Sequence, residues 1–259
     1  MSLAEPLRVG PLRRVNPVAK LAAVLVLSAT LILTVDWVSA SVALVLEVVL
    51  LGLTRLPFRA AALRAVPLVI AAILAGLTTV LYGQPSGHTY WEFWSVHVTE
   101  GSIALAVATT LRILAIGIPA VVLFLTIDPT DLADGLAQIV RLPSRFVIGG
   151  LAALRLMGLL TEDWRAIELA RRARGVADRG RLRRIVGQVF ALLVLSIRRA
   201  SKLATAMEAR GFGAPGPRTW ARPSRFGRID WFVIALGGAV AAAAVAIAVA
   251  TGSWHFVAS

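Results

Sequence analysis

The feature that most constrains the fold is a series of five apolar stretches that approach or reach the length of a bilayer crossing. A spanning helix needs about 20 apolar residues, within a range of about 17–25. The chain is 58% hydrophobic and only 16% charged, as expected for a membrane protein. We therefore predict an all-α membrane protein with about five transmembrane helices. They cover residues 21–35, 38–53, 66–82, 102–127 and 231–251.

The basic residues are distributed unevenly between the two sides of these stretches. Four precede the first stretch, three lie between the second and third, and nineteen lie between the fourth and fifth. The connection at residues 36–37, the loop at residues 83–101 and the tail after residue 251 contain none. Because cytoplasmic segments carry an excess of Lys and Arg, this pattern predicts a multi-pass protein with its N-terminus inside and its C-terminus outside.

The long segment before the last stretch predicts a domain of its own. We divide the chain into a membrane domain with four spans at 1–127, cytoplasmic helices at 128–230, and a C-terminal span with an outer tail at 231–259. Helix-start and helix-stop residues predict two long crossed helices in the middle part, at 144–174 and 181–210. Their apolar runs are short and flanked by arginine, so we predict that both helices lie outside the membrane.

The second of these long helices has an apolar stripe with alternating spacings of four and three residues. This spacing places the residues on one face of a helix. The stripe predicts a packing seam for a partner helix or for another membrane subunit. An amphipathic helix that lies on anionic lipid headgroups is the alternative. The main residues of the seam are Phe190, Leu193, Ile197 and Met207.

Both long helices end in the same six-residue pattern, A-x-x-A-R-G, at residues 170–175 and 206–211. Gly just past a helix permits a left-handed turn, and Arg in the last turn suits the negative end of the helix dipole. A helix end with small Ala side chains and one guanidinium fits a groove that contains a carboxylate. Two copies therefore predict two docking sites. The candidate docking residues are Ala173, Arg174, Gly175, Ala209, Arg210 and Gly211.

These helix ends are similar to those of a known family. The chain resembles the transmembrane coupling component, or T component, of energy-coupling factor (ECF) transporters, which has two Ala-Arg-Gly signatures at the ends of cytoplasmic helices. The N-terminal sequence at residues 16–21, NPVAKL, and the Arg-bearing span around Arg112 also fit the family pattern. So do Asp163, before the first signature, and Phe212, after the second.

The resemblance implies a function and a set of partners. Each Ala-Arg-Gly signature would dock into a groove of one of two ABC ATPase subunits. A small substrate-binding membrane subunit, the S component, would capture a vitamin or a metal ion. The chain would transmit ATPase closure to that subunit in the bacterial cytoplasmic membrane. It needs no cofactor of its own, since ATP would be bound by the partner ATPases and the sequence contains no P-loop motif.

Other functions are less consistent with the sequence. The permease subunit of another ABC importer is the main alternative, but such proteins usually have one short coupling helix per docking site. The acidic residues show no metal-ligand spacing, so we expect neither enzyme activity nor a metal site. Nucleic-acid binding is disfavoured because the arginines lack interleaved aromatic residues.

Two ionisable residues lie inside the predicted spans. Glu47 is nine residues into the second span from its outer end, and Arg112 is ten residues into the fourth. Because ionisable groups inside a bilayer usually pair, their similar depth predicts a contact between them. The alternative is that each faces a separate polar pocket.

Overall fold

A computed structural model shows that the chain is almost entirely helical. It describes residues 14–34, 36–54, 58–83, 86–93, 96–175, 180–214 and 219–253. These residues form eight helices and one two-stranded sheet. The predicted all-α membrane fold is therefore confirmed. The elements are α1 (Pro17–Leu33), α2 (Trp37–Leu53), α3 (Phe58–Tyr82), β1 (Thr89–Phe93), β2 (Val96–Thr99), α4 (Glu100–Thr126), α5 (Pro129–Gln138), α6 (Ser144–Ala173), α7 (Arg181–Ala209) and α8 (Arg228–Ala250).

The elements divide into two compact units. One unit, which we call the membrane unit, comprises Met1–Leu132 and Arg225–Ser259. The other, which we call the helical arm, comprises Ala133–Ser224. The chain therefore passes between the two units twice, once within α5 and once just before α8.

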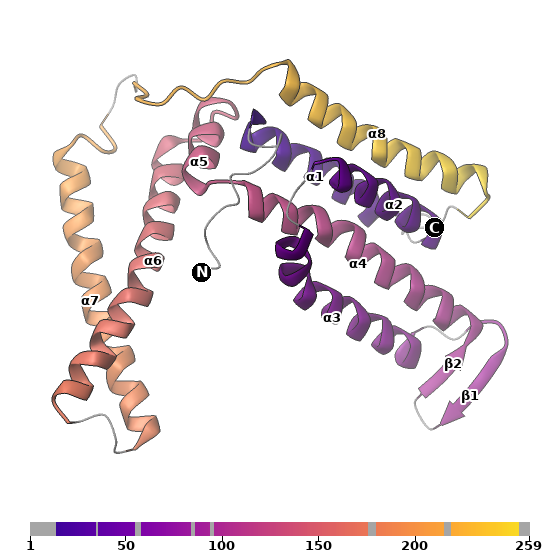
Figure 1. Cartoon of the computed structure of the whole chain (residues 1–259), viewed down its shortest axis with the longest axis horizontal. Helices are drawn as coiled ribbons and strands as arrows, with labels where there is room; N and C mark the ends of the chain where they lie inside the picture. Colours follow the sequence, from indigo (N-terminus) through magenta and orange to yellow (C-terminus); the bar gives the residue numbers. More distant parts are fainter. Residues whose placement is uncertain are drawn as a thin grey trace. The chain divides into compact units, whose positions relative to one another are not determined.

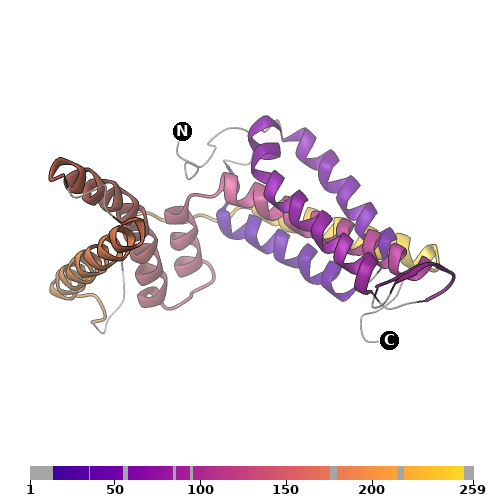
Figure 2. The same cartoon turned by 90° about the horizontal axis from the view of Figure 1, so that it is seen from below.

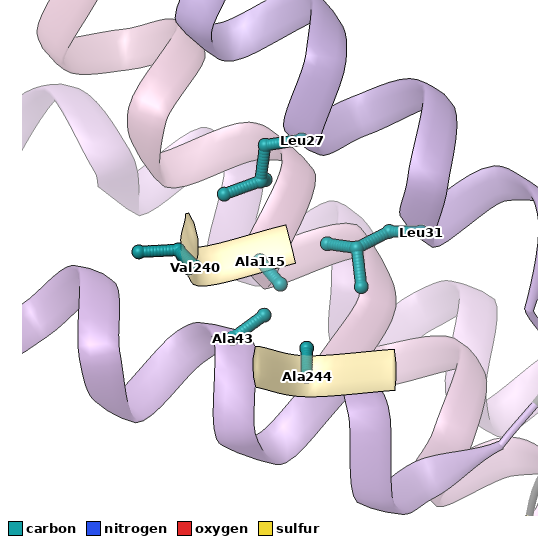
Figure 3. Packing of buried hydrophobic residues seen from close by; sticks show 6 residues of the cluster. All are labelled: Leu27, Leu31, Ala43, Ala115, Val240 and Ala244. Carbon is teal, nitrogen blue, oxygen red and sulfur yellow. The ribbon is translucent and has the colours of Figure 1, made fainter. Parts of the chain in front are cut away.

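Apolar helices pack side by side in the membrane unit (Figure 1). Helix α4 packs against α1, α2 and α3, and α8 packs against α1 and α2. Figure 3 shows the core where α1, α2, α4 and α8 meet. Small side chains dominate this core, so the helices can approach closely. The cluster contains Leu27, Leu31, Ala43, Ala115, Val240 and Ala244.

Glycines at two helix contacts leave no room for a side chain. A Cβ added to Gly76 of α3 would lie 2.2 Å from Oγ1 of Thr110 on α4. One turn before Gly76, Ala72 is fully buried and its carbonyl accepts a 3.4 Å hydrogen bond from Thr110. A Cβ on Gly237 of α8 would lie 2.9 Å from that of Ala23 on α1. The contacts of α3 with α4 and of α1 with α8 therefore use small residues, as is common in membranes.

The loop predicted at residues 83–101 contains an antiparallel β-hairpin. Strands β1 and β2 pair with Trp91 opposite Val98 and with Thr89 opposite Thr99, and a register shift lies between these pairs. Thr99 then caps α4, because its side chain accepts a 3.2 Å hydrogen bond from the backbone of Ser102. Tyr90 and Trp91 are exposed on the hairpin. Amphipathic aromatic rings of this kind are typical of a membrane–water interface.

Among the described residues, α3, α4, α6 and α8 are long and apolar enough to cross a membrane. Helices α1 and α2 have 17 residues each, the lower limit for a span. Helix α6 was not among the predicted spans. Its 30 residues are long enough to cross a membrane and include a sufficiently apolar stretch, although the mean hydropathy of that stretch, 1.4, is the lowest of the four. Its location outside the membrane stays a prediction from the charge pattern.

The helical arm is built around α6 and α7, which pack antiparallel and cross each other (Figures 1 and 2). The carboxylate of Asp163 on α6 accepts two hydrogen bonds, of 2.5 and 3.2 Å, from the guanidinium of Arg199 on α7. Nearer the turn of this helical hairpin, the Arg171 guanidinium lies over Gly187, where an added Cβ would meet it at 3.1 Å. Polar side chains therefore join the two helices at two levels.

Candidate docking site at two helix ends

The C-terminus of α6 ends as the sequence pattern requires. Ala173 is the last helical residue, and Arg174 has φ −89° and ψ 3°. Gly175 follows with φ +66°, in the left-handed region that favours glycine. Its backbone N–H donates a 3.0 Å hydrogen bond to the carbonyl of Arg172. This bond satisfies a carbonyl that the helix would otherwise leave unpaired.

The C-terminus of α7 has the same geometry, and two hydrogen bonds close it. Arg210 has φ −92° and ψ 12°, and Gly211 has φ +79°. The Gly211 N–H donates to the Glu208 carbonyl at 2.9 Å, and the Phe212 N–H donates to the Met207 carbonyl at 2.9 Å. Together these two bonds are a Schellman motif, which fixes the direction in which the chain leaves the helix.

We call Ala173-Arg174-Gly175 and Ala209-Arg210-Gly211 the two signature ends. All six of their residues are exposed. In each six-residue copy only the second position, Arg171 or Met207, is half-buried. Within the part of the chain that the structure describes, neither the Arg174 nor the Arg210 guanidinium forms a hydrogen bond or an ion pair. Both are therefore available to a partner.

The ion pair between Asp163 and Arg199 lies midway between the two signature ends along the helices. Arg174 follows Asp163 by eleven residues on α6, and Arg210 follows Arg199 by eleven residues on α7. At a rise of 1.5 Å per residue, each arginine is about 16 Å along its helix from the pair. Because the helices are antiparallel, the signature ends point away from the pair in opposite directions and are up to about 33 Å apart. A single groove cannot hold both.

This ion pair was not predicted. Spacing alone does not identify the contact, because the two signature arginines have the same offset of 36 residues as Asp163 and Arg199 and yet lie far apart. The Asp163 side chain is only 15% exposed, so the pair is partly shielded from water.

The predicted seam on α7 does not pack against another helix of the arm over most of its length. Phe190 is 66% exposed and Leu193 is 53% exposed. Ile197 is 58% exposed, although it lines a shallow apolar pocket against α6, and Met207 is half-buried. The buried and half-buried face of α7 instead combines polar and apolar residues. It includes Gln188, Leu192, Leu195, Arg199 and Leu203.

The prediction of a partner helix within the chain was therefore wrong for Phe190 and Leu193. Apolar periodicity identified the stripe correctly but could not tell that another face, which contains the buried Gln188 and the Arg199 that pairs with Asp163 of α6, is turned inward. The second option, a contact with another subunit, stays a prediction.

The predicted contact between Glu47 and Arg112 is also wrong. A guanidinium nitrogen of Arg112 donates to the backbone carbonyl of Thr34, at the end of α1, and Asp36 is the charged group that interacts with it. Glu47 is 5% exposed, and neither of its carboxyl oxygens has a hydrogen-bond partner in the described structure. Arg112 therefore contacts the end of α1, next to the start of α2. Glu47 is buried within the helix bundle and does not pair with Arg112.

The fold and the helix ends define a class of protein. A bundle of apolar helices is joined to an arm whose two long helices present matching, exposed arginine ends. These features define a multi-pass all-α membrane protein with a long helical arm that presents two exposed cationic helix ends.

Comparison with known proteins identifies the family. Residues 9–220 match the family described as cobalt transport protein CbiQ. The chain is 29% identical over 199 residues to the energy-coupling factor transporter transmembrane protein EcfT of Limosilactobacillus fermentum, which covers 72% of this chain and 74% of the relative. It is 32% identical over 189 residues to the EcfT protein of Bacillus selenitireducens, with 68% and 70% covered. The EcfT protein of Lacticaseibacillus paracasei is 30% identical over 185 residues, with 66% and 69% covered.

The chain therefore belongs to the CbiQ family, which includes the transmembrane components of energy-coupling factor transporters. The resemblance seen in the sequence is confirmed at this level.

Proposed function

We propose that this chain is the coupling subunit of an ECF-type importer. In this function it transmits the conformational change of two ABC ATPase subunits to a small substrate-binding membrane subunit that takes up a vitamin or a metal ion. The arm lies in the cytosol, with the N-terminus inside and the C-terminus outside, as the positions of the basic residues favour.

The observation that carries this proposal is the pair of signature ends. Their backbone geometry is the same, their arginines are exposed, and they lie up to about 33 Å apart at opposite ends of one helical hairpin. This arrangement suits two separate ATPase grooves. Each guanidinium can pair bidentately with a carboxylate, which gives direction as well as affinity to the contact.

The exposed stripe of α7 favours a membrane subunit as the third partner. Phe190, Leu193 and Ile197 are each more than half exposed, and they follow one another on one face of the helix. A contiguous apolar surface of this kind is typical of an interaction site. A rotation of α7 would displace a substrate-binding subunit that packs on this stripe.

Charge reversal at the signature ends tests the docking role. Arg174→Glu and Arg210→Glu are made singly and together in the full chain, and copurification of the ATPase subunits is measured. We expect each single variant to retain part of the ATPase and the double variant to lose it, because each site contributes to a two-site contact.

The matched control reverses two arginines that lie on the same helices outside the signatures. Arg165→Glu on α6 and Arg198→Glu on α7 change exposed residues and the same total charge. This control should copurify with the ATPases as the parent does. Undiminished ATPase binding by the Arg174→Glu/Arg210→Glu variant would refute the docking role.

A further inference from the structure

The first turn of α1 contacts both segments that connect the membrane unit to the helical arm. One connection leaves the end of α4 at Thr126 and continues into α5. The other enters α8 through Arg225 and Asp230. Motion of the arm can reach the membrane unit along the chain only through these two connections, since the chain passes between the units only there.

Asn16 holds the connection into α8. Its side-chain amide donates a 3.0 Å hydrogen bond to the carbonyl of Arg225, and its backbone N–H donates a 2.6 Å bond to Oδ1 of Asp230. The other oxygen of Asp230 accepts from the Gly227 N–H at 2.7 Å and so caps α8. Asn16 and Asp230 are 8% and 5% exposed. Because these bonds are shielded from water, breaking them leaves unpaired polar groups, which is costly.

Lys20, one turn further along α1, holds the connection that leaves α4. Its ammonium donates a 3.2 Å hydrogen bond to the carbonyl of Thr126, the last residue of α4. A cation at this position also suits the negative end of the α4 dipole. Lys20 is 7% exposed, and Asp131 in the first turn of α5 is the opposite charge that interacts with it.

The arm ties the same two connections together at its own end. Gln138, the last residue of α5, donates a 2.8 Å hydrogen bond to the Arg222 carbonyl and accepts a 2.8 Å bond from the Ser224 N–H. A single side chain therefore bridges the connections directly.

We propose that Asn16 and Lys20 are positioning residues that clamp the two connections to α1, so that the connections move as one body when the arm moves. Without the clamp, the end of α4 and the start of α8 could separate. Part of the arm's motion would then move these two helix ends apart instead of moving the membrane unit. This inference rests on the proposed coupling function, but it concerns residues outside the signature ends.

The test measures the distance between the two connections in the full complex. Spin labels are attached at Phe124→Cys on α4 and Ile229→Cys on α8, which are 89% and 55% exposed and carry no role in the clamp. The chain has no cysteine of its own, so only these two sites react when it is labelled before the ATPases are added. Distances are recorded in the complex with copurified ATPases, without nucleotide and with Mg·AMP-PNP.

Asn16→Ser together with Lys20→Met removes the two side-chain bonds of the clamp and leaves the bond from the backbone N–H of residue 16 to Asp230. Ser retains a side-chain cap for α1 but is too short to reach Arg225, and Met retains the apolar stem of Lys. We expect one narrow distance in both nucleotide states of the parent, and a second, longer component in the double variant when Mg·AMP-PNP is bound. When Lys20→Arg replaces Lys20→Met in the double variant, the cation is retained and the longer distance component should disappear.

A control label pair at Val45→Cys and Ile73→Cys, exposed residues of α2 and α3, should not change. An unchanged distance between the connections in the Asn16→Ser/Lys20→Met variant would overturn the proposal. Equal broadening at the control pair would also overturn it, because the residues would then have only a general structural role. ATPase copurification should stay normal in all clamp variants, whereas failure of the docking proposal would be seen only with the Arg174 and Arg210 variants.

Discussion

Substitution of Gly211 by Ala tests whether docking depends on the turn that ends α7 or on the arginine alone. Gly211 has φ +79°, and an added Cβ would meet no heavy atom of the chain within 4 Å. The substitution therefore introduces backbone strain without a steric clash. A residue other than glycine in the left-handed region costs about 1–2 kcal/mol.

This cost converts directly into an expected loss of affinity. Because 1.4 kcal/mol corresponds to a tenfold change in an equilibrium constant, the native turn should become about 5–30 times less favoured. If the ATPase binds only the native turn, its dissociation constant should rise by up to the same factor. Gly211→Asn should cost less, since Asn tolerates the left-handed region better than Ala does.

The assay is an equilibrium titration of the ATPase subunits onto the full chain in nanodiscs, in an Arg174→Glu background that leaves one signature end active. The matched control is Gly213→Ala, because Gly213 has φ +86° and equally open surroundings but lies outside the signature. We expect the control to bind normally. Parent-like affinity in Gly211→Ala would refute a role for the turn. A loss far beyond about 30-fold would show that strain is not the main cause.

Three further changes test contacts within each unit. Gly76→Leu should destabilise the membrane unit by about 1–3 kcal/mol in detergent thermal unfolding, since α4 leaves no room for a Cβ, whereas Gly52→Leu at an open position should change little; equal stability would contradict the close packing. Asp163→Asn and Arg199→Gln should show a coupling of about 1 kcal/mol in a double-mutant cycle, because the pair is only partly shielded; additive effects would exclude a coupled pair. Glu47→Gln should be tolerated and Glu47→Lys should cost about 3 kcal/mol, because a buried charge without a partner is expensive in a bilayer; a strongly destabilised Gln variant would indicate a missed partner.

The sequence predicted the elements of the arm closely, because local chemistry determines where they begin and end. Asp128 caps α5 through a 2.8 Å hydrogen bond from the Thr130 N–H. Gly175 and Gly211 end α6 and α7 in left-handed turns. Such helix boundaries depend on a few neighbouring residues, so sequence alone is sufficient to find them.

The partner of Arg112 could not be predicted, because it depends on how far each helix extends past its neighbours. Helix α4 has 27 residues and α1 has 17, so their lengths are about 40 Å and 25 Å. Counting depth from the outer end of each span assumes that all spans begin at one level. In the structure Arg112 of α4 meets Thr34, where α1 ends. The helices therefore begin at different levels.

The contact between α6 and α7 shows a second limit of sequence analysis. Hydrophobic periodicity assigned the inner face of α7 to the stripe that includes Phe190, which the structure leaves 66% exposed. On the inward face Arg199 pairs with Asp163, Gln188 is 3% exposed, and Leu192, Leu195 and Leu203 are half-buried. A face of mixed polar and apolar residues therefore forms the internal contact, while the more regular apolar stripe stays exposed.

The equal distances of the two signature ends from the Asp163–Arg199 pair have a mechanical consequence. For a rotation of α6 against α7 about this pair, each signature end acts through a lever about 16 Å long. A rotation of about 10° moves either end by roughly 3 Å, a shift of the size seen when packed helices slide. Because the two levers are equal, equal and opposite forces at the two ends would change the angle between the helices without displacing the pair. A force at one end alone would also displace the pair.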